Sequence, residues 1–192
     1  MTKTLILASA SPRRHDLLSA AGICHTVLTQ NTDESLPYGT APEKAVELLS
    51  AQKAAAVLPI SPAGAVILAA DTVVALDGEI LGKPQNEADA KRMLFALSGR
   101  DHYVYTGVTV TDGKKTVTRH QKTTVRMRSL SESEIDAYIK TGEPMDKAGA
   151  YGIQGRASLF VSGIDGDYAN VVGLPVSLVG EILRLDFAFP LF

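Results

Sequence analysis

Residues 66–76, Val-Ile-Leu-Ala-Ala-Asp-Thr-Val-Val-Ala-Leu, form the segment that most limits how this chain can fold. Only Asp71 and Thr72 are polar in this run, and such a composition is typical of a strand buried inside a sheet. The dipeptide Asp77-Gly78 follows directly and favours a two-residue hairpin turn into Glu79-Ile-Leu81. We therefore expect a long central strand that turns back on itself.

The rest of the chain alternates helix signals with short strands. Leu5–Ala8 is a short buried strand by its composition, and Asp112-Gly113 joins two runs rich in Val and Thr. A further turn is expected at Asp165-Gly166, within the last strand region. Helix starts are predicted at Ser11-Pro12, at a capping box of Thr40 and Glu43, at Asn86, at a second box of Ser131 and Glu134, and at Pro175. Helices interspersed with hairpins predict a mixed sheet of the α/β (mixed α+β) class, not a βαβ repeat.

Composition excludes several classes of protein. The 192 residues carry no repeat or linker, so we expect one domain over residues 1–192. Lys and Arg number 19 against 21 Asp and Glu, a net charge of −2 that argues against a binder of nucleic acid polymers. No apolar run reaches the ~18 residues of a membrane span. The run Leu5–Ala8 is shorter than the ~7 residues of a signal sequence. With the single Cys24, these features predict a cytoplasmic location.

Asp71 is the leading candidate for chemistry. A carboxylate buried without partners costs several kcal/mol or becomes neutral. One interpretation is a structural carboxylate that accepts backbone N–H groups at a bulge. The other is a general base or metal ligand in a cleft, where nearby cations set its pKa. We favour the second, because basic side chains elsewhere in the chain can serve as its partners.

The segment Ser9–Arg14 lies where a strand ends and a helix begins. Free backbone N–H groups and the helix dipole make such a junction suitable for an anion. Ser9 and Ser11 add hydroxyl groups, and Arg13 and Arg14 add guanidinium groups suited to phosphate. The alternative interpretation is a capped helix with two solvated arginines.

Two lysines are further candidates. Residues 78–84 resemble a Walker loop, but they are one residue short and have proline where Ser or Thr is required, so we exclude that motif. Lys83 remains on a rigid Lys-Pro corner, where it is either a solvated turn residue or a ligand for an anion. Lys53 shares a helix face with Val46 and Leu49, which indicates either a snorkelling side chain or one that reaches an anionic cleft.

The glycine-rich segment 149–155 is either an ordinary irregular loop or a loop that approaches a ligand closely. Gln154 within it can both donate and accept hydrogen bonds, which suits the edge of a nucleobase. The histidines show no metal-ligand spacing and receive no role; they are His15, His25, His102 and His120.

Taken in order, these motifs resemble the Maf family over residues 5 to about 180. The matching segments are Ser9–Arg14, Ala70–Val73, Gly82–Pro84, Leu97–Gly99, Ala148–Gly155 and Val172–Pro175. Each motif alone is weakly specific, whereas six in sequence are highly specific. The tyrosine-containing loop around Gln154 resembles the branch that acts on dTTP and UTP, not the 7-methyl-GTP branch.

The resemblance implies a fold, an activity and a cofactor. The fold is an elongated mixed sheet flanked by helices, with two lobes around a central cleft, related to inosine triphosphate pyrophosphatases. The activity is hydrolysis of a nucleoside triphosphate between its α- and β-phosphates, which yields the monophosphate and pyrophosphate, with a house-cleaning role. A divalent cation (Mg²⁺ or Mn²⁺), a cytoplasmic location and a homodimer are also implied. The same resemblance leaves open a 7-methyl-GTP or other modified-nucleotide substrate, and a nucleotide-binding regulator of septum formation.

The resemblance also assigns roles to individual residues of this sequence, at the positions that match the family's motifs. Asp71 matches the proposed general base and is also the candidate metal ligand. Arg13, Thr72 and Gln154 match positions tied to substrate choice. The polar positions that line the family's cleft correspond to Ser9, Arg14, Glu34, Lys53 and Lys83. Because four basic residues would then converge on one cleft in a nearly neutral protein, we expect positive potential to be confined to that cleft.

Overall fold

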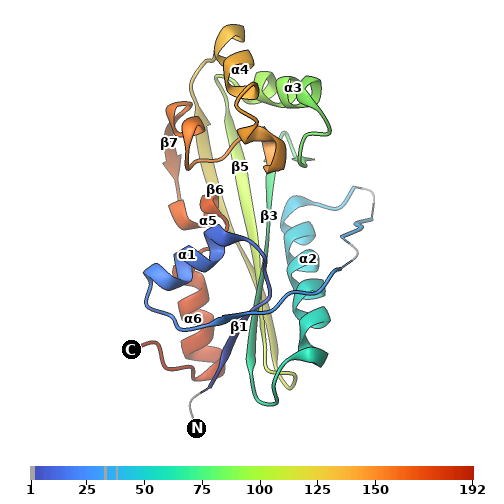
Figure 1. The fold of residues 1–192 in the computed structure, drawn as a ribbon, viewed down its shortest axis with the longest axis vertical. Coiled ribbons are helices and arrows are strands. Elements are labelled where there is room, and N and C mark those ends of the chain that lie inside the picture. Colours follow the sequence, from blue (N-terminus) through green and yellow to red (C-terminus); the bar gives the residue numbers. More distant parts are fainter. Residues whose placement is uncertain (1–2, 33, 38) are drawn as a thin grey trace.

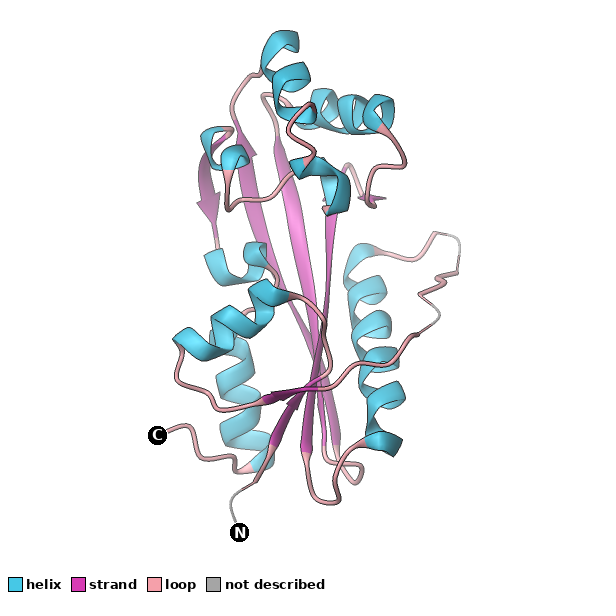
Figure 2. Ribbon diagram, viewed as in Figure 1, coloured by secondary structure: helices cyan, strands magenta, loops and turns pink. Residues whose placement is uncertain are grey.

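The computed structural model describes residues 3–32, 34–37 and 39–192. Seven strands form one mixed sheet, with helices at both ends of the molecule (Figures 1 and 2). The strands are β1 (Leu5–Leu7), β2 (Thr26–Val27), β3 (Val66–Leu76), β4 (Glu79–Leu81), β5 (Asp101–Thr111), β6 (Thr116–Met127) and β7 (Val161–Asp165). The α-helices are α1 (Pro12–Ala20), α2 (Pro42–Val57), α3 (Glu87–Leu97), α4 (Glu132–Ile139), α5 (Tyr168–Val172) and α6 (Val176–Phe187). Short 3₁₀ helices are η1 (Leu58–Ile60), η2 (Glu143–Asp146), η3 (Ala148–Ala150) and η4 (Arg156–Leu159).

The sheet order is β2-β1-β3-β5-β6-β7, and β4 pairs with β3. Strand β1 is parallel to both of its neighbours, and the other pairs are antiparallel. The long strands β3, β5 and β6 join a lower lobe that holds α1, α2 and α6 to an upper lobe that holds α3 and α4 (Figure 1). The expected elongated mixed sheet with two lobes is therefore confirmed. Within the described part of the chain, no helix is long and apolar enough to span a membrane.

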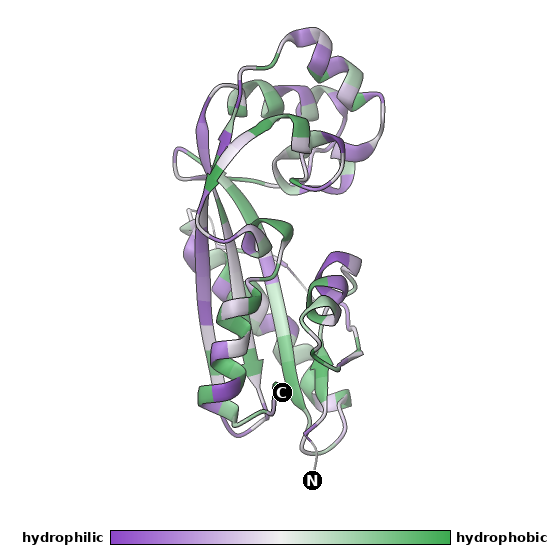
Figure 3. Ribbon diagram, turned by 90° about the vertical axis from the view of Figure 1, so that its left-hand side faces the viewer, coloured by the Kyte–Doolittle hydropathy of each residue, from purple (hydrophilic) through white to green (hydrophobic). Residues whose placement is uncertain are grey.

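Strand β3 contributes to all three hydrophobic clusters, because its side chains alternate between the two faces of the sheet. Val66, Leu68 and Ala70 pack in a cluster with α6 and with Leu18 of α1. Ile67 and Ala69 pack on the opposite face, in a cluster with α2. Further along, Val74 and Leu76 join the upper cluster around α3 and α4. In Figure 3, hydrophobic segments run along a central strand and appear on helices of both lobes, whereas another long strand is mainly hydrophilic.

Asp71 and Thr72 therefore lie between the lower and upper clusters. By the same alternation, Asp71 faces α2 and Thr72 faces the side of α1. The register with β5 runs without a shift from Ile67 to Ala75, so Asp71 does not lie at a bulge. The interpretation of Asp71 as a carboxylate held by backbone groups at a bulge is wrong.

Gly107 of β5 allows α2 to pack directly on the sheet. It pairs with Asp71 in the β3–β5 register. A Cβ atom at Gly107 would lie 2.1 Å from the carbonyl oxygen of Val46 on α2, a distance that no real contact permits. The missing side chain thus brings α2, and with it Lys53, to the strand that carries Asp71.

Several local predictions are confirmed. Asp77 and Gly78 both have positive φ angles, of 53° and 84°, as a tight hairpin turn requires. The Asn86 side chain accepts a hydrogen bond from the backbone N–H of Asp89 at 2.9 Å and caps α3. Ser131 and Glu134 form the expected capping box at α4.

Other local predictions are wrong. Helix α2 begins at Pro42 with Ala41 as its cap, and the Thr40 hydroxyl donates to the carbonyl of Pro37 instead of forming a box with Glu43. Pro42 favours the first helical position, which makes Ala41 the N-cap and puts the helix start one residue later than a cap at Thr40 would. Asp165-Gly166 does not turn within a strand: β7 ends at Asp165 and α5 follows, capped by Asp167.

Two helix starts are right in place but differ in detail. Ser11 is the N-cap residue of α1, as predicted, but its side chain makes no capping hydrogen bond. Pro175 is the N-cap of α6, which begins at Val176.

Candidate active site

A cleft of about 1180 Å³ lies where β3 passes from one lobe to the other. It takes residues from α1, α2, β3, the corner after β4 and the loop between η3 and η4. The structure brings all of the sequence-predicted site residues to this cleft: Ser9, Arg13, Arg14, Glu34, Lys53, Asp71, Thr72, Lys83 and Gln154.

The ammonium group of Lys53 joins two carboxylates in the cleft. Its Nζ lies 2.5 Å from Oδ1 of Asp71 and 2.8 Å from Oε1 of Glu34. The side chains of Lys53 and Asp71 are largely buried, with 19% and 12% of their surface exposed, whereas Glu34 is 58% exposed. A buried carboxylate that is paired in this way avoids most of the cost of isolated burial. Lys53 therefore reaches two carboxylates in the cleft and does not extend into solvent, which agrees with the second of the two interpretations of its sequence position.

Arg14 is held by the protein on three sides. Its Nε donates to the carbonyl of Gly173 at 2.8 Å, Nη1 donates to Ser9 Oγ at 3.0 Å, and Nη2 donates to Thr72 Oγ1 at 3.1 Å. Burial lowers the pKa of the Arg14 guanidinium, Asp71 opposes this shift, and Arg13 adds to it. Arg14 is thus a connector between α1, β3 and the segment after α5, and not the solvated arginine of the alternative interpretation.

The contacts of Thr72 continue away from the cleft. Its hydroxyl lies 2.9 Å from that of Thr106, its partner in the β3–β5 register. Thr106 donates to the carbonyl of Asn170 at 3.0 Å, and Asn170 Nδ2 donates to Thr123 Oγ1 at 2.9 Å. Sequence reasoning missed Thr106 and Asn170. The first could have been found as a polar cross-strand partner of Thr72, whereas the second lies on a five-residue helix without a periodic pattern.

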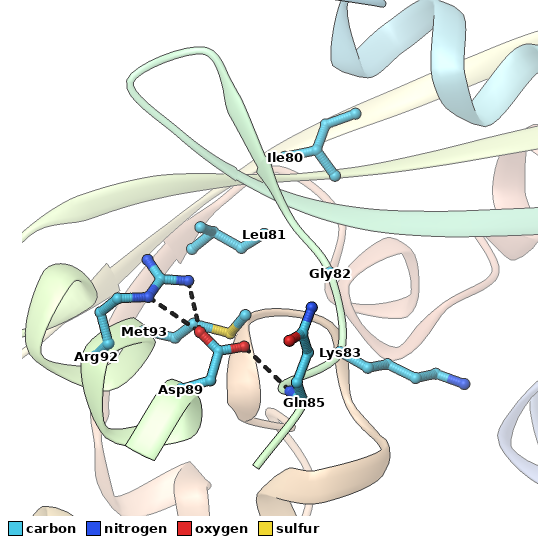
Figure 4. Close-up of a pocket in the computed structure, with 8 residues that line it drawn as sticks. All are labelled: Ile80, Leu81, Gly82, Lys83, Gln85, Asp89, Arg92 and Met93. Carbon is cyan, nitrogen blue, oxygen red and sulfur yellow. Dashed lines mark hydrogen bonds and ion pairs between the residues drawn. The ribbon is translucent and has the colours of Figure 1, made fainter. Parts of the chain in front are cut away.

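Lys83 lies beside a second, smaller pocket of about 290 Å³ on the hairpin (Figure 4). An ion pair of 2.7 Å between Asp89 and Arg92 occupies one side of this pocket, and Asp89 also accepts the backbone N–H of Gln85 at 3.1 Å. The side chain of Lys83 points away from this ion pair (Figure 4). Because Lys83 also lines the larger cleft, its ammonium group is available there.

The upper wall of the cleft is charged as well, which the sequence did not indicate. Lys147 Nζ lies 2.6 Å from Oδ1 of Asp146 and donates to the carbonyl of Glu143 at 2.7 Å. The hydrogen bond from Lys147 lowers the pKa of Asp146, and the charge of Arg13 contributes to this shift.

The charges of the cleft nearly balance. Among the described residues that line it, the basic ones are Arg13, Arg14, Lys53, Lys83 and Lys147, and the acidic ones are Glu34, Asp71, Glu143 and Asp146. The four predicted basic residues do converge. Five basic groups against four acidic ones leave this lining with one positive charge in a chain of net charge −2, so the confinement of positive potential to the cleft stays a prediction.

The donor set of the cleft fits a hard divalent cation that is shared with a ligand. The described residues contain no group of three His, Cys, Asp or Glu side chains that would hold a metal ion by themselves. Asp71 and Glu34 nevertheless bring two carboxylates to one ammonium group. Mg²⁺ is commonly bound by one or two carboxylates together with substrate phosphates and water, so these two residues suit it.

This arrangement defines a class before any comparison. A mixed sheet carries a buried carboxylate at a cleft between two lobes, with guanidinium and ammonium groups around it that suit the phosphate groups of a ligand. Comparison with known proteins specifies the family. The family model described as "Maf-like protein" matches residues 4–185, and the chain belongs to this family.

Curated relatives cover nearly the whole chain. A protein from Symbiobacterium thermophilum named dTTP/UTP pyrophosphatase is 49% identical over 98% of this chain and 96% of its own length. A protein of the same name from Bacillus cereus is 49% identical over 96% of this chain and 91% of its own length. Among solved structures, the Ham1 protein of Staphylococcus aureus is 14% identical with a TM-score of 0.48, covering 65% of this chain and 72% of that one.

Proposed function

We propose that this chain hydrolyses dTTP and UTP to the nucleoside monophosphate and pyrophosphate. The observation that carries the proposal is the buried Asp71, paired with Lys53, which also pairs with Glu34, in a cleft that Arg13 and Lys83 line as well. The curated relatives described above, which are named for this activity, support the choice of substrates.

Asp71 is the proposed catalytic residue. Its carboxylate accepts a proton from the water that attacks the α-phosphorus, or it would hold a divalent cation beside this water. Because Lys53 contacts the same carboxylate at 2.5 Å, the ammonium group orients Asp71 and places a positive charge next to the reacting phosphates. The bond between the α-phosphorus and its bridging oxygen to the β-phosphorus breaks, and pyrophosphate leaves.

Cationic side chains stabilise the charge that develops on the leaving pyrophosphate. Arg13 and Lys83 line the cleft and take this role directly. Arg14 acts differently, because its N–H groups already donate to Ser9, Thr72 and Gly173. It fixes the walls of the cleft around the substrate.

The cleft also needs a divalent cation in this proposal. A triphosphate carries several negative charges, whereas the charged residues that line the cleft nearly cancel one another. Asp71 and Glu34 would hold Mg²⁺ or Mn²⁺ together with phosphate oxygens. When bound, the cation supplies charge neutralisation at the triphosphate and lowers the pKa of a coordinated water.

Gln154 is the proposed contact for the base. It is exposed at the upper wall of the cleft, and its amide can donate and accept at once, as the edge of a pyrimidine requires. Arg13 and Thr72 contribute to substrate choice from the opposite wall. We further propose a homodimer in the cytoplasm, as the family resemblance implies; light scattering of the purified protein would test the dimer by its mass of two chains.

The proposal is tested with a panel of common and modified triphosphates, at catalytic amounts of protein, with Mg²⁺, Mn²⁺ or chelator. We expect release of pyrophosphate from dTTP and UTP that requires the cation and exceeds release from CTP, GTP and 7-methyl-GTP. Binding of nucleotide without turnover would contradict the proposed activity and favour a regulatory protein. A preference for 7-methyl-GTP would contradict the proposed substrates.

A further inference from the structure

His102 and Tyr151 form a buried polar pair behind the wall of the cleft. His102 lies on β5 with no exposed surface, and its Nε2 is 2.6 Å from the hydroxyl oxygen of Tyr151. The two rings meet edge to face, with 5.2 Å between their centroids. Tyr151 is 4% exposed and belongs to the upper hydrophobic cluster, yet it also lines the cleft. Neither residue has a part in the chemistry proposed above.

Burial determines the charge state of this pair. It lowers the pKa of His102 to about 4, and the charge of Asp101 and the carbonyl of Arg100 offset only part of this shift. Burial also raises the pKa of the Tyr151 hydroxyl. Both groups are therefore neutral near pH 7. With the ring proton on Nδ1, on the side of the Arg100 carbonyl, Nε2 is the acceptor and the Tyr151 hydroxyl donates to it. Among the described residues, Nδ1 has no hydrogen-bond partner of normal geometry, so Tyr151 provides the main polar anchor of this ring.

The backbone around Tyr151 is held in an unusual conformation. Gly149 and Ala150, the two residues before it, have φ angles of 69° and 60°. Ala150 is not glycine, and such a conformation persists only where neighbouring contacts enforce it. One contact is the N–H of Gly149, which donates to the carbonyl of Gly82 at 3.0 Å, next to Lys83. Another is the N–H of Ala150, which donates to the carbonyl of Lys147 at 3.1 Å. The hydrogen bond between Tyr151 and His102 adds a side-chain anchor to these two backbone contacts.

Gln154 follows Tyr151 by three residues and, unlike it, is exposed. An exposed side-chain amide can distinguish one nucleobase from another by hydrogen bonds only if the backbone that carries it is fixed. The fixed points before it are the buried side chains of Tyr151 and Ile153. Of these, only Tyr151 is held in direction by a hydrogen bond.

We infer that Tyr151 is a positioning residue for base selection, and that His102 is the acceptor that holds it. This inference rests on the proposed function, because it concerns how the loop presents Gln154 to the base. A phenyl ring at position 151 would fill the same space, so the role belongs to the hydroxyl and not to the ring.

The test compares Tyr151→Phe with Thr111→Val in the panel of triphosphates. Thr111 is also buried and its hydroxyl also donates within the protein, to Lys115, but it lies at the far end of β5. For Tyr151→Phe we expect KM for dTTP and UTP to rise by about 3- to 10-fold, the effect of one hydrogen bond, with less change in kcat. The preference for dTTP and UTP over CTP and GTP narrows by a similar factor. Thr111→Val keeps the wild-type KM and preference.

A second pair of variants tests the acceptor. His102→Gln replaces the ring nitrogen by an amide oxygen that can accept from Tyr151, and His102→Leu leaves no acceptor. We expect the leucine variant to show the altered preference of Tyr151→Phe and the glutamine variant to retain more of the wild-type preference. The double variant Tyr151→Phe with His102→Leu should change the preference no more than either single change, because both remove the same contact.

The outcomes separate the inference from the proposed function. A wild-type protein that turns over no triphosphate contradicts both. An active wild type together with a Tyr151→Phe variant of unchanged KM and unchanged preference contradicts the inference alone, even if that variant is less stable. Equal shifts of preference in Tyr151→Phe and Thr111→Val would also overturn it, since the effect would then come from general loss of stability.

Discussion

Two neighbouring arginines on α1 have different tasks in this cleft. Arg14 donates to a backbone carbonyl and to two hydroxyl groups, each on a different segment of the chain. Arg13 lines the cleft and adds positive charge near Asp146. A guanidinium that spans three acceptors cannot be replaced by a lysine, whose ammonium group lacks the planar fork. The pair Arg13-Arg14 therefore combines a ligand contact with a structural connection.

Replacement of each arginine by lysine should separate these tasks. Arg14→Lys loses hydrogen bonds made by a charged and largely enclosed group, so its free energy of unfolding should fall by about 1.5–3 kcal/mol. Arg13→Lys should keep wild-type stability and raise KM for the triphosphate instead. Urea unfolding and steady-state kinetics measure the two effects. Equal stability of the two variants would contradict the structural task of Arg14.

The residue scale also shows what sequence reasoning can find in a site. Asp71 was predicted because a carboxylate in an apolar strand needs a partner, and Lys53 because it interrupts an apolar helix face. The structure agrees with both expectations, because Asp71 and Lys53 form one ion pair. Glu34 had no such signal and came only from the family resemblance, since it lies in an irregular segment. Lys147 and its contacts were not predicted, because a charged residue in a turn usually indicates only a solvated surface.

At the scale of elements, the approach of α2 to the sheet decides the geometry of the Asp71–Lys53 pair. Gly107 makes this approach possible, since a Cβ atom there would overlap the carbonyl of Val46. Gly163 on β7 is a matched control, because a Cβ atom at that position meets nothing within 4 Å.

We expect Gly107→Ala to destabilise the protein by about 1–3 kcal/mol or more, since the helix must shift. It should also lower kcat, because Lys53 moves with α2. Gly163→Ala should leave both quantities close to wild type. Urea unfolding measures the stability of the two variants, and pyrophosphate release measures their kcat. A Gly107→Ala variant as stable and active as Gly163→Ala would contradict the close packing of α2.

Elements could be predicted from sequence where local chemistry alone decides them. The Asp77-Gly78 turn, the Asn86 cap and the box at Ser131 are of this kind, and the structure confirms them. The predicted capping box of Thr40 and Glu43 does not form, because Pro42 takes the first position of α2 and Ala41 is its N-cap. Helix α5 was missed because it has five residues and is held by distant contacts, such as Asn170 with Thr123. The order of strands likewise depends on pairings far apart in the chain, which no local pattern reveals.

At the scale of the whole molecule, buried His102 connects stability to pH. Its pKa in the folded protein is about 4, below the ordinary value of 6.5. Between these two pH values the unfolded chain binds the proton and the folded protein does not. The stability that depends on a neutral His102 is therefore fully present above pH 6.5 and is lost as the pH falls towards 4.

We expect His102 to cost about 3 kcal/mol of stability between pH 6.5 and pH 4, on top of the loss from carboxylates. In His102→Gln this contribution is absent, since glutamine does not titrate. Urea unfolding at several pH values, with the two proteins compared at each, isolates it. If the free energy of unfolding depended on pH in the same way for wild type and variant over this range, the assignment of a neutral buried imidazole would be contradicted.

Asp71, in the cleft between the two lobes, is the carboxylate on which the proposed hydrolysis depends. The most direct measurement is the turnover of dTTP with Mg²⁺ by Asp71→Asn, with Asp77→Asn as the control. Asp77 is an exposed turn residue paired with Arg100, and asparagine tolerates its positive φ angle. Wild type and Asp77→Asn should release pyrophosphate and the monophosphate at similar rates. Folded Asp71→Asn should be slower by about 10²- to 10⁴-fold. Near-normal turnover by folded Asp71→Asn, or release of orthophosphate in place of pyrophosphate by the wild type, would contradict the account.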